Sequence, residues 1–175
     1  LLENICRAVN IALVNEMKTV LTEMDIDVWE VVRAASTKPF GFMPFFPGPG
    51  LGGHCIPIDP FYLSWLAKQH GTETQFIDLA GRINTDMPSY VVQRVTSVLN
   101  EQERSLRGSR VLILGISYKE DSDDSRESPA FPIMQEMLDA GALVTFSDPF
   151  FGALPQKRDF HMEVEHIALT EENVA

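Results

Sequence analysis

The 175-residue sequence contains little cysteine, little positive charge and no long hydrophobic run. Cys6 and Cys55 are its two cysteines, too few for a disulfide framework, so we expect reduced thiols and a cytoplasmic location. No segment approaches the roughly 18 consecutive apolar residues that indicate a transmembrane helix. No basic region leads into an apolar run at the N-terminus either. We therefore expect neither a membrane span nor a signal peptide.

The shortage of positive charge argues against one class of partner. The 25 acidic and 14 basic residues give a formal net charge of −11, which opposes binding to nucleic acid. A small anionic ligand is still compatible with this charge, because Lys119 and Arg126 act at contact distance, where they outweigh the overall field. His54 and Cys55 are too few neighbouring ligands for zinc, so no metal site is expected.

The sequence also lacks a convincing dinucleotide fingerprint. Gly48, Gly50 and Gly53 spell Gly-x-Gly-x-x-Gly, but the segment before them is too rich in proline for a central strand, and no helix is expected to open at Gly53. We call residues 47–54 the glycine loop. Its glycines, which include Gly52, suit a backbone that needs positive φ or that approaches a ligand closely.

Cys55 follows the glycine loop directly. Asp59 and Pro60 are typical of an N-cap and a first helical position, so they predict a helix over 60–70, with Gly71 as the residue that follows it. A thiol just before the positive end of a helix is favoured as the thiolate, which is a nucleophile. Two simpler interpretations stay open, in which Cys55 is a buried small hydrophobe and Asp59 is only a helix cap.

The hydrophobic pattern of the N-terminal part predicts further helices. Their expected ranges are 1–24, 28–35 and 74–104. Asp27 is the predicted N-cap of the second of these. Pro88 predicts a kink or break near Thr85 in the last one. The segment 36–59 is predicted to be irregular, and a connection of that length is usually functional.

The pattern changes after Gly108. The predicted elements are a strand over 110–115, a helix over 129–140 and a strand over 142–146. A strand–helix–strand unit of this kind gives a parallel pair of strands. The predicted fold class is therefore α + α/β, with a helical domain over residues 1–105 and a partial Rossmann-like parallel domain over residues 106–175.

The loop from Ile116 to Glu127 follows the first predicted strand. Open α/β sheets bind ligands at the carboxyl ends of their strands, which is where this loop begins. It contains Tyr118, Lys119 and Arg126. A ligand-binding role and a solvated charged loop are both compatible with these residues.

Two strings give these observations a common context. GPGLGGHCIPIDP (48–60) and GISYKEDSDDSRESPA (115–130) resemble the UDP-glucose/GDP-mannose dehydrogenase family, and the likeness covers nearly the whole chain. TKPFGFM (37–43) is most similar to the branch that acts on UDP-N-acetylglucosamine. Pro39 stands where some UDP-glucose members have arginine, which weakens assignment to UDP-glucose. UDP-N-acetylmannosamine and UDP-glucose remain the alternative substrates.

The resemblance implies a four-electron oxidation that uses NAD. The sugar C6 alcohol would become an aldehyde and then a carboxylate. By position, Cys55 would attack the aldehyde to form a thiohemiacetal, which a second oxidation converts to a thioester. Asp59 would position or deprotonate the hydrolytic water, and Asn4 would donate to the reacting oxygen.

The resemblance also implies binding residues. Those matching the wall of the nucleotide-sugar site are Phe45, Phe46, Gly52 and Gly53. Tyr118 and Lys119 match residues that hold the uracil end and the sugar, and Arg126 matches a contact to the cofactor pyrophosphate. Aromatic faces suit a base, and cations suit a diphosphate.

Family members combine an NAD-binding Rossmann domain, a helical middle used for dimerisation and a C-terminal domain that binds the nucleotide. This chain resembles the middle and part of the last, so we expect a fragment that forms a homodimer through its central helices. The family lysine four residues before Asn4 has no counterpart here, and neither does the NAD-binding domain, so the chain alone is expected to be inactive. A non-catalytic dimerisation and ligand-binding module, or a structural domain with an inert Cys55, are the alternatives.

Overall fold

The computed structural model describes residues 1–174, except for the side chains of Glu172 and Val174. The chain forms two compact units, the first from Leu1 to Met87 and the second from Pro88 onward, and each is described by itself. The division falls inside a helix, earlier than the domain boundary expected from the sequence. It does so because the second half of that helix packs on the core of the second unit.

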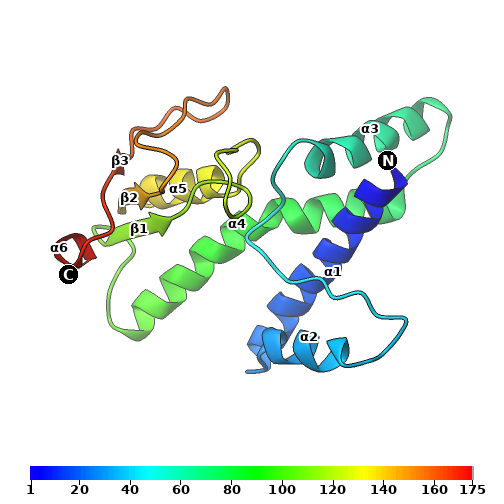
Figure 1. Ribbon diagram of the computed structural model, residues 1–175, viewed down its shortest axis with the longest axis horizontal. Coiled ribbons are helices and arrows are strands. Elements are labelled where there is room, and N and C mark those ends of the chain that lie inside the picture. The colour runs from blue at the N-terminus through cyan, green and yellow to red at the C-terminus, as the bar shows by residue number, and fades with distance from the viewer. Residues whose placement is uncertain (175) are drawn as a thin grey trace. The chain divides into compact units, whose positions relative to one another are not determined.

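Unit 1 is helical (Figure 1). Its elements are α1 (Leu2–Glu23), α2 (Val28–Ser36), α3 (Cys55–Gln69) and the first part of α4 (Gln75–Glu101). The first two helices agree with the predicted ranges. Asp27 caps α2 as predicted, because its carboxylate accepts a hydrogen bond from the N–H of Trp29 at 2.8 Å. Helix α2 packs against α1 through Leu21, Val28 and Val32.

Helix α3 begins earlier than predicted. It starts at Cys55 with His54 as its N-cap, so Asp59 and Pro60 are neither the cap nor the first helical residue. Pro57 lies in the first turn, where backbone N–H groups have no helical partner and a missing donor costs little. Pro60 lies inside the helix, and its ring is buried. The Asp59–Pro60 pair, which is typical of a helix start, is therefore also compatible with a helix that already started at Cys55.

Helix α4 continues past Pro88 as one element, so the helix has no break near Thr85, and the kink that was the other predicted outcome stays a prediction. Pro88 removes a single N–H from the helical bond pattern. The helix before it is fixed by tertiary packing, because Ile77, Ala80 and Met87 are all buried. Packing of one helical face stabilises helices in proteins more than local propensity does, so it offsets the proline here.

The buried face of α1 is built from small residues. Ala8, Ala12 and Asn15 are buried, whereas the larger Leu13 and Val20 are exposed. A helix can approach its neighbours closely through alanines, while Leu13 and Val20 lie on the exposed side of α1. None of the described helices is long and apolar enough to cross a lipid bilayer.

Unit 2 contains a small parallel sheet (Figure 1). After α4 its elements are β1 (Arg110–Leu114), α5 (Ala130–Asp139), β2 (Leu143–Ser147), β3 (Glu165–His166) and α6 (Glu171–Val174). The strand order is β1-β2-β3 with parallel pairing throughout, and Ile113 lies opposite Phe146. These findings confirm the predicted α + α/β class. Strand β3 was not predicted, because two residues are too few for a periodic pattern.

The core of unit 2 lies between α5 and the sheet. Phe131 and Met134 of α5 and Phe146 of β2 are almost completely buried, together with Ile116 at the start of the β1–α5 loop. The second half of α4 covers this core with Val91, Val92, Val95 and Leu99. The buried Ile116 therefore anchors the loop in which a ligand role was predicted.

Candidate functional site

The three predicted catalytic residues lie together at the start of α3. Asn4 of α1 donates a hydrogen bond from Nδ2 to Oδ2 of Asp59 at 2.8 Å, although 55 positions separate them in sequence. Cys55 is exposed and lies four positions before Asp59, which places both on one side of the helix. An exposed thiol, a carboxylate and an amide are thus grouped where the glycine loop enters α3.

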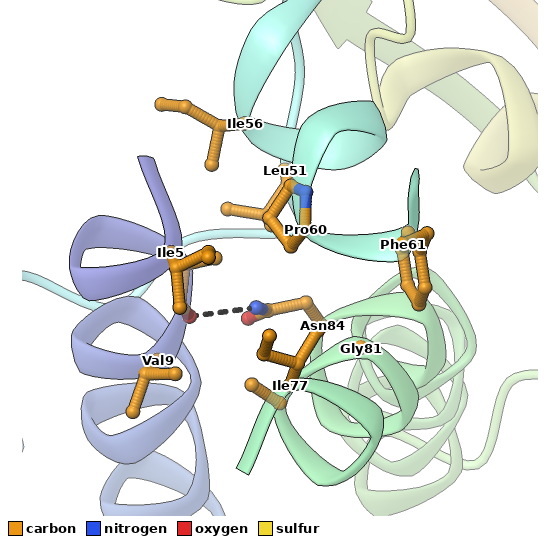
Figure 2. Close-up of a pocket in the computed structure, with 11 residues that line it drawn as sticks. Ile5, Val9, Leu51, Ile56, Pro60, Phe61, Ile77, Gly81 and Asn84 are labelled. Atoms are coloured by element: carbon orange, nitrogen blue, oxygen red, sulfur yellow. Dashed lines mark hydrogen bonds between the residues drawn. The ribbon is translucent and has the colours of Figure 1, made fainter. Parts of the chain in front are cut away.

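An apolar contact among three helices supports this group. Figure 2 shows Ile5 of α1, Ile56 and Pro60 of α3 and Ile77 of α4 around a small cavity. The cavity volume is about 10 Å³, on the order of one water molecule, so it is a packing gap and not a ligand site. Pro60 directly follows Asp59, and its burial here fixes α3 against α1 near the Asn4–Asp59 bond.

The glycine loop adopts the kind of backbone that its composition predicted. Gly50 and Gly53 have φ values of 143° and 86°, which non-glycine residues rarely adopt. Helix α3 opens at Cys55, two residues after Gly53 and earlier than the start predicted at Pro60. In the described segment before the loop, residues 1–46, the structure has helices and no strand, so the Gly-x-Gly-x-x-Gly string lacks the strand that a dinucleotide fingerprint follows. The N–H of Gly48 donates to Oδ1 of the buried Asn15 at 2.9 Å.

The two phenylalanines before the loop differ in environment. Phe45 is half-buried, whereas Phe46 is exposed and stacks on Trp29 of α2, with ring centroids 5.8 Å apart and planes 17° from parallel. Sequence reasoning missed Trp29, because no local pattern links a residue of α2 to a residue of the later loop. The stacked pair presents a flat aromatic surface next to the glycine loop.

In unit 2, an open hollow of about 390 Å³ lies at the carboxyl ends of β1 and β2. It is lined by Leu114, Gly115, Ser117, Lys119, Glu120, Asp121, Ser122, Asp148, Pro149 and Phe150. Asp148 is buried and accepts hydrogen bonds from the N–H groups of Ile116 and Phe150, each at 2.8 Å. Its carboxylate therefore joins the two loops that border the hollow, at the edge where open parallel sheets bind ligands.

Of the predicted ligand residues in the β1–α5 loop, Lys119 lines this hollow. Lys119 is exposed, and its Nζ is 5.5 Å from the ring centroid of the half-buried Tyr118. The N–H of Tyr118 donates to the carbonyl of Asp124 at 3.1 Å, which closes the loop on itself. A cation and an aromatic ring are thus held next to each other in this loop.

Arg126 forms a charged pair within the same loop. Its Nη2 and Nε donate to the carboxylate of Asp124, with the shortest distance 2.6 Å. These hydrogen bonds lower the pKa of Asp124 from its ordinary 3.8 to about 2. The Arg126 side chain is 64% exposed, so its guanidinium is accessible to an anion in solution.

Sequence reasoning also missed Lys157. Its Nζ donates to the carbonyl and to Oγ of Ser125, at 2.7 and 3.0 Å, and lies 4.7 Å from the ring centroid of Phe131. Burial lowers the pKa of this amine. Lys157 therefore ties the chain after β2 to the residue before Arg126. A single lysine in an irregular segment gives no sequence signal for such a contact.

The predicted site residues fall into two groups, one in each unit. Unit 1 contains Asn4, Phe45, Phe46, Gly52, Gly53, Cys55 and Asp59. Unit 2 contains Tyr118, Lys119 and Arg126. Within the part of the chain that the structure describes, no three His, Cys, Asp or Glu side chains form a group able to hold a metal ion.

Comparison with known proteins assigns the chain. Residues 1–86 match the central domain of the UDP-glucose/GDP-mannose dehydrogenase family, and residues 112–174 match the UDP binding domain of the same family. The chain belongs to this family. The two matched segments correspond to the helical unit and to the sheet, and they confirm the resemblance inferred from the two sequence strings.

Individual nucleotide-sugar dehydrogenases are also similar to this chain. The chain is 37% identical over 152 residues to UDP-N-acetyl-D-glucosamine 6-dehydrogenase of Pseudomonas aeruginosa, which covers 87% of this chain and 36% of that protein. It is 37% identical over 149 residues to a UDP-N-acetyl-D-mannosamine dehydrogenase of Methanococcus maripaludis, covering 85% and 33%. The chain therefore spans about a third of the length of these relatives.

A solved structure agrees with the fold. The NDP-N-acetyl-D-galactosaminuronic acid dehydrogenase of Methanosarcina mazei superposes with a TM-score of 0.84 at 29% identity, over 97% of this chain and 36% of that one. The helical unit and the parallel sheet thus recur together in a dehydrogenase of this family.

Proposed function

We propose that the full-length protein containing this chain is an NAD-dependent nucleotide-sugar 6-dehydrogenase that oxidises UDP-N-acetylglucosamine to the uronic acid. The observation that carries the proposal is the hydrogen bond from Asn4 to Asp59, one helical turn from the exposed Cys55. A nucleophile, a base and an oxyanion donor are the groups needed to oxidise an aldehyde through a covalent intermediate. Family membership supports the reaction class.

Cys55 is the proposed nucleophile. Oxidation of the C6 alcohol gives an aldehyde, to which the Cys55 thiolate adds to form a thiohemiacetal. Removal of hydride from that carbon gives a thioester, and water then releases the carboxylate and the thiolate. NAD⁺, when bound, supplies the hydride acceptor for both oxidations. Covalent attachment retains a reactive aldehyde between the two steps.

Asn4 and Asp59 have complementary proposed roles. The Asn4 amide carries two N–H bonds, of which one donates to Asp59 and the other is oriented by that contact toward the reacting oxygen. The Asp59 carboxylate uses Oδ2 for Asn4 and has Oδ1 to accept a proton from the hydrolytic water. The hydrogen bond therefore orients the donor and the base together.

The remaining site residues are proposed to bind ligands. Phe45, Phe46, Gly52 and Gly53 would line the nucleotide-sugar site. Tyr118 and Lys119 would hold the uracil end and the sugar, and Arg126 the NAD pyrophosphate. The proposed protein acts in the cytoplasm as a homodimer. The chain alone is proposed to be inactive, because it spans about a third of the length of the relatives.

The sugar is proposed to be UDP-N-acetylglucosamine, with UDP-N-acetylmannosamine and UDP-glucose as the alternatives. The name of the Pseudomonas aeruginosa relative supports the first, and that of the Methanococcus maripaludis relative supports the second. A panel of UDP-hexoses and UDP-N-acetylhexosamines, assayed with the full-length protein, distinguishes them. We expect two NADH per sugar, with the highest kcat/KM for UDP-N-acetylglucosamine.

Replacement of Cys55 tests the mechanism. In full-length Cys55→Ser, acid formation is expected to fall by at least about 10³-fold, because a serine hydroxyl is a far weaker nucleophile at neutral pH. Mass spectrometry should detect a sugar adduct on Cys55 in the parent and none in the variant. Asp59→Asn is a matched second variant, expected to form the adduct and to hydrolyse it about 10²- to 10⁴-fold more slowly. Normal acid formation by Cys55→Ser without an adduct would refute the proposed nucleophile.

A second candidate is a dimerisation and nucleotide-sugar-binding module without catalysis. The exposed apolar side chains of α1 and the open hollow of unit 2 favour it for the chain on its own. Binding of UDP by the full-length protein, with no NADH formed from any sugar of the panel, would select this candidate.

A further inference from the structure

Unit 1 contains a buried row of amide groups that takes no part in the proposed chemistry. Asn15 of α1 and Asn84 of α4 are 0% and 4% exposed. The N–H of Gly48 donates to Asn15 Oδ1 at 2.9 Å, and Asn15 Nδ2 donates to Asn84 Oδ1 at 2.9 Å. Asn84 Nδ2 then donates to the carbonyl of Ala8 at 3.0 Å, the bond dashed in Figure 2. We call these four groups the amide relay.

The direction of the amide relay is fixed at both ends. The Gly48 N–H can only donate, and the Ala8 carbonyl can only accept. Asn15 must therefore present its oxygen to Gly48 and its nitrogen to Asn84, and Asn84 must in turn present its oxygen to Asn15. Reversing either amide would leave a buried polar atom without a partner, which is costly in a low-dielectric interior.

Apolar side chains could fill the positions of Asn15 and Asn84, so close packing alone does not explain two buried amides here. The same buried face of α1 carries Ala8 and Ala12, whose side chains are apolar and add no side-chain polar group to the buried face. Buried polar groups add little net stability over apolar packing, but a fully satisfied network specifies a single arrangement. The arrangement specified here is the position of Gly48.

We infer that Asn15 is a positioning residue for the glycine loop. The loop starts beside Gly48 and ends at His54, the N-cap of the helix that carries Cys55. Asn15 lies on α1, the same helix that carries Asn4. Its bond to Gly48 therefore fixes the loop to the element that supplies the proposed oxyanion donor. The inference rests on the proposed function for the ligand that this loop binds.

Three variants of the full-length protein separate positioning from simple stability. Asn15→Leu has a similar volume and cannot accept from Gly48. Asn15→Asp keeps an acceptor for Gly48 and loses the donor to Asn84. Asn84→Asp keeps the acceptor for Asn15 and loses only the donor to Ala8. All three are expected to lower Tm, because each leaves a buried polar group unpaired or buries a charge.

The readouts are hydrogen exchange at Gly48, which needs no substrate, and the separate values of KM and kcat for the preferred UDP-sugar. We expect Asn15→Leu to speed exchange at Gly48 by about tenfold and to raise KM by about tenfold, since one hydrogen bond is lost. Asn15→Asp and Asn84→Asp are expected to retain parental exchange at Gly48 and parental KM. If Asn15→Leu does not fold, Asn15→Ala replaces it, because alanine already occupies this helix face.

Two results would overturn the positioning role. The first is parental exchange at Gly48 in Asn15→Leu or Asn15→Ala. The second is a rise in KM in Asn84→Asp equal to that in Asn15→Leu at the same loss of Tm. A parent protein that oxidises no UDP-sugar, together with faster exchange at Gly48 in Asn15→Leu, would refute the proposed function and support the positioning role.

Discussion

The carboxylate of Asp59 is available to Asn4 because α3 begins at Cys55. A helix starting at Pro60, as predicted, would have made Asp59 its N-cap, with the side chain accepting from backbone N–H groups. In the second turn of α3, the same side chain projects sideways to a neighbouring helix. The local role of one residue thus follows from where its helix starts.

Asp124 provides a measurable test at the same scale. Because Arg126 lowers its pKa to about 2, the pair stabilises the fold fully above pH 4 or so, and this contribution is lost as pH falls toward 2. An NMR titration of the Asp124 carboxyl carbon should have its midpoint near 2. In Arg126→Gln the midpoint should return toward 3.8, and the stabilities of parent and variant should converge at the lowest pH.

Arg126→Lys is the matched control, because it keeps the charge and loses the planar pair of N–H donors. Its midpoint should lie between those of the parent and Arg126→Gln. A parental Asp124 titration near 3.8 would show that the two side chains are not paired in solution.

The identity of the proposed catalytic residues was predictable from the sequence, but the contacts between them were not. The resemblance pointed to Cys55, Asn4 and Asp59, whereas the bond between the last two depends on packing between separate helices. Asn15 does carry a sequence signal, since its spacing places it on one helix face with Ala8 and Ala12. That signal is weak, because most polar residues on amphipathic helices face solvent.

Among the elements, prediction was best for helices whose apolar pattern repeats over many residues and for the βαβ unit. Prediction was wrong for the start of α3, since an Asp-Pro pair can also lie inside a helix that starts earlier. Of the kink or break predicted in α4, the break is absent, since burial of the first half of the helix outweighs one missing hydrogen bond. The contact of α3 with α4 was beyond local pattern altogether. There, Gly81 of α4 faces the ring of Phe61 on α3 (Figure 2).

Gly81→Ala tests this helix–helix contact. A Cβ at this position would lie 2.4 Å from Phe61 Cζ, so the ring must move. Overpacking of this kind costs about 1–3 kcal/mol, which exceeds the gain of about 1 kcal/mol from replacing glycine by alanine in a helix. We therefore expect Gly81→Ala to lower the free energy of unfolding, measured by urea denaturation.

The Phe61→Ala background provides the control for this prediction. With the ring removed, Gly81→Ala should become stabilising by about 1 kcal/mol, the ordinary helix-propensity effect. The same sign in both backgrounds would argue against the contact. The parent, the two single variants and the double variant form a double-mutant cycle. The departure of their free energies of unfolding from additivity measures the contact between positions 61 and 81.

At the scale of the whole molecule, unit 1 leaves large apolar side chains uncovered. Leu13 and Val20 on α1, Phe61 and Trp65 on α3, and Phe76 and Leu79 on α4 are exposed. Clusters of this kind on globular proteins usually mark interfaces. They support the proposed homodimer through the central helices.

Sedimentation of the full-length protein tests the dimer. We expect a dimer at micromolar concentration, and we expect Leu13→Asp or Leu79→Asp to weaken it by at least about tenfold through a buried charge. Leu169→Asp is the control, because Leu169 is as exposed as Leu13 (63% against 57%) but lies in unit 2. A monomeric parent at high concentration would refute the dimer. Equal weakening by Leu169→Asp would show that the dimer interface is not confined to the central helices.

Helix α4 has a consequence for how such proteins diversify. Val91, Val92, Val95 and Leu99 belong to a helix that starts in unit 1, yet they complete the core of unit 2. Recombination between relatives could exchange their sheets at a crossover after α4. Each exchanged sheet would then pack against the α4 side chains of the other protein, which did not evolve with that core. A crossover near Pro88 would transfer the sheet together with its own helical cover. The lineage record of such exchanges should therefore show breakpoints inside the helix and not in the loop that follows it.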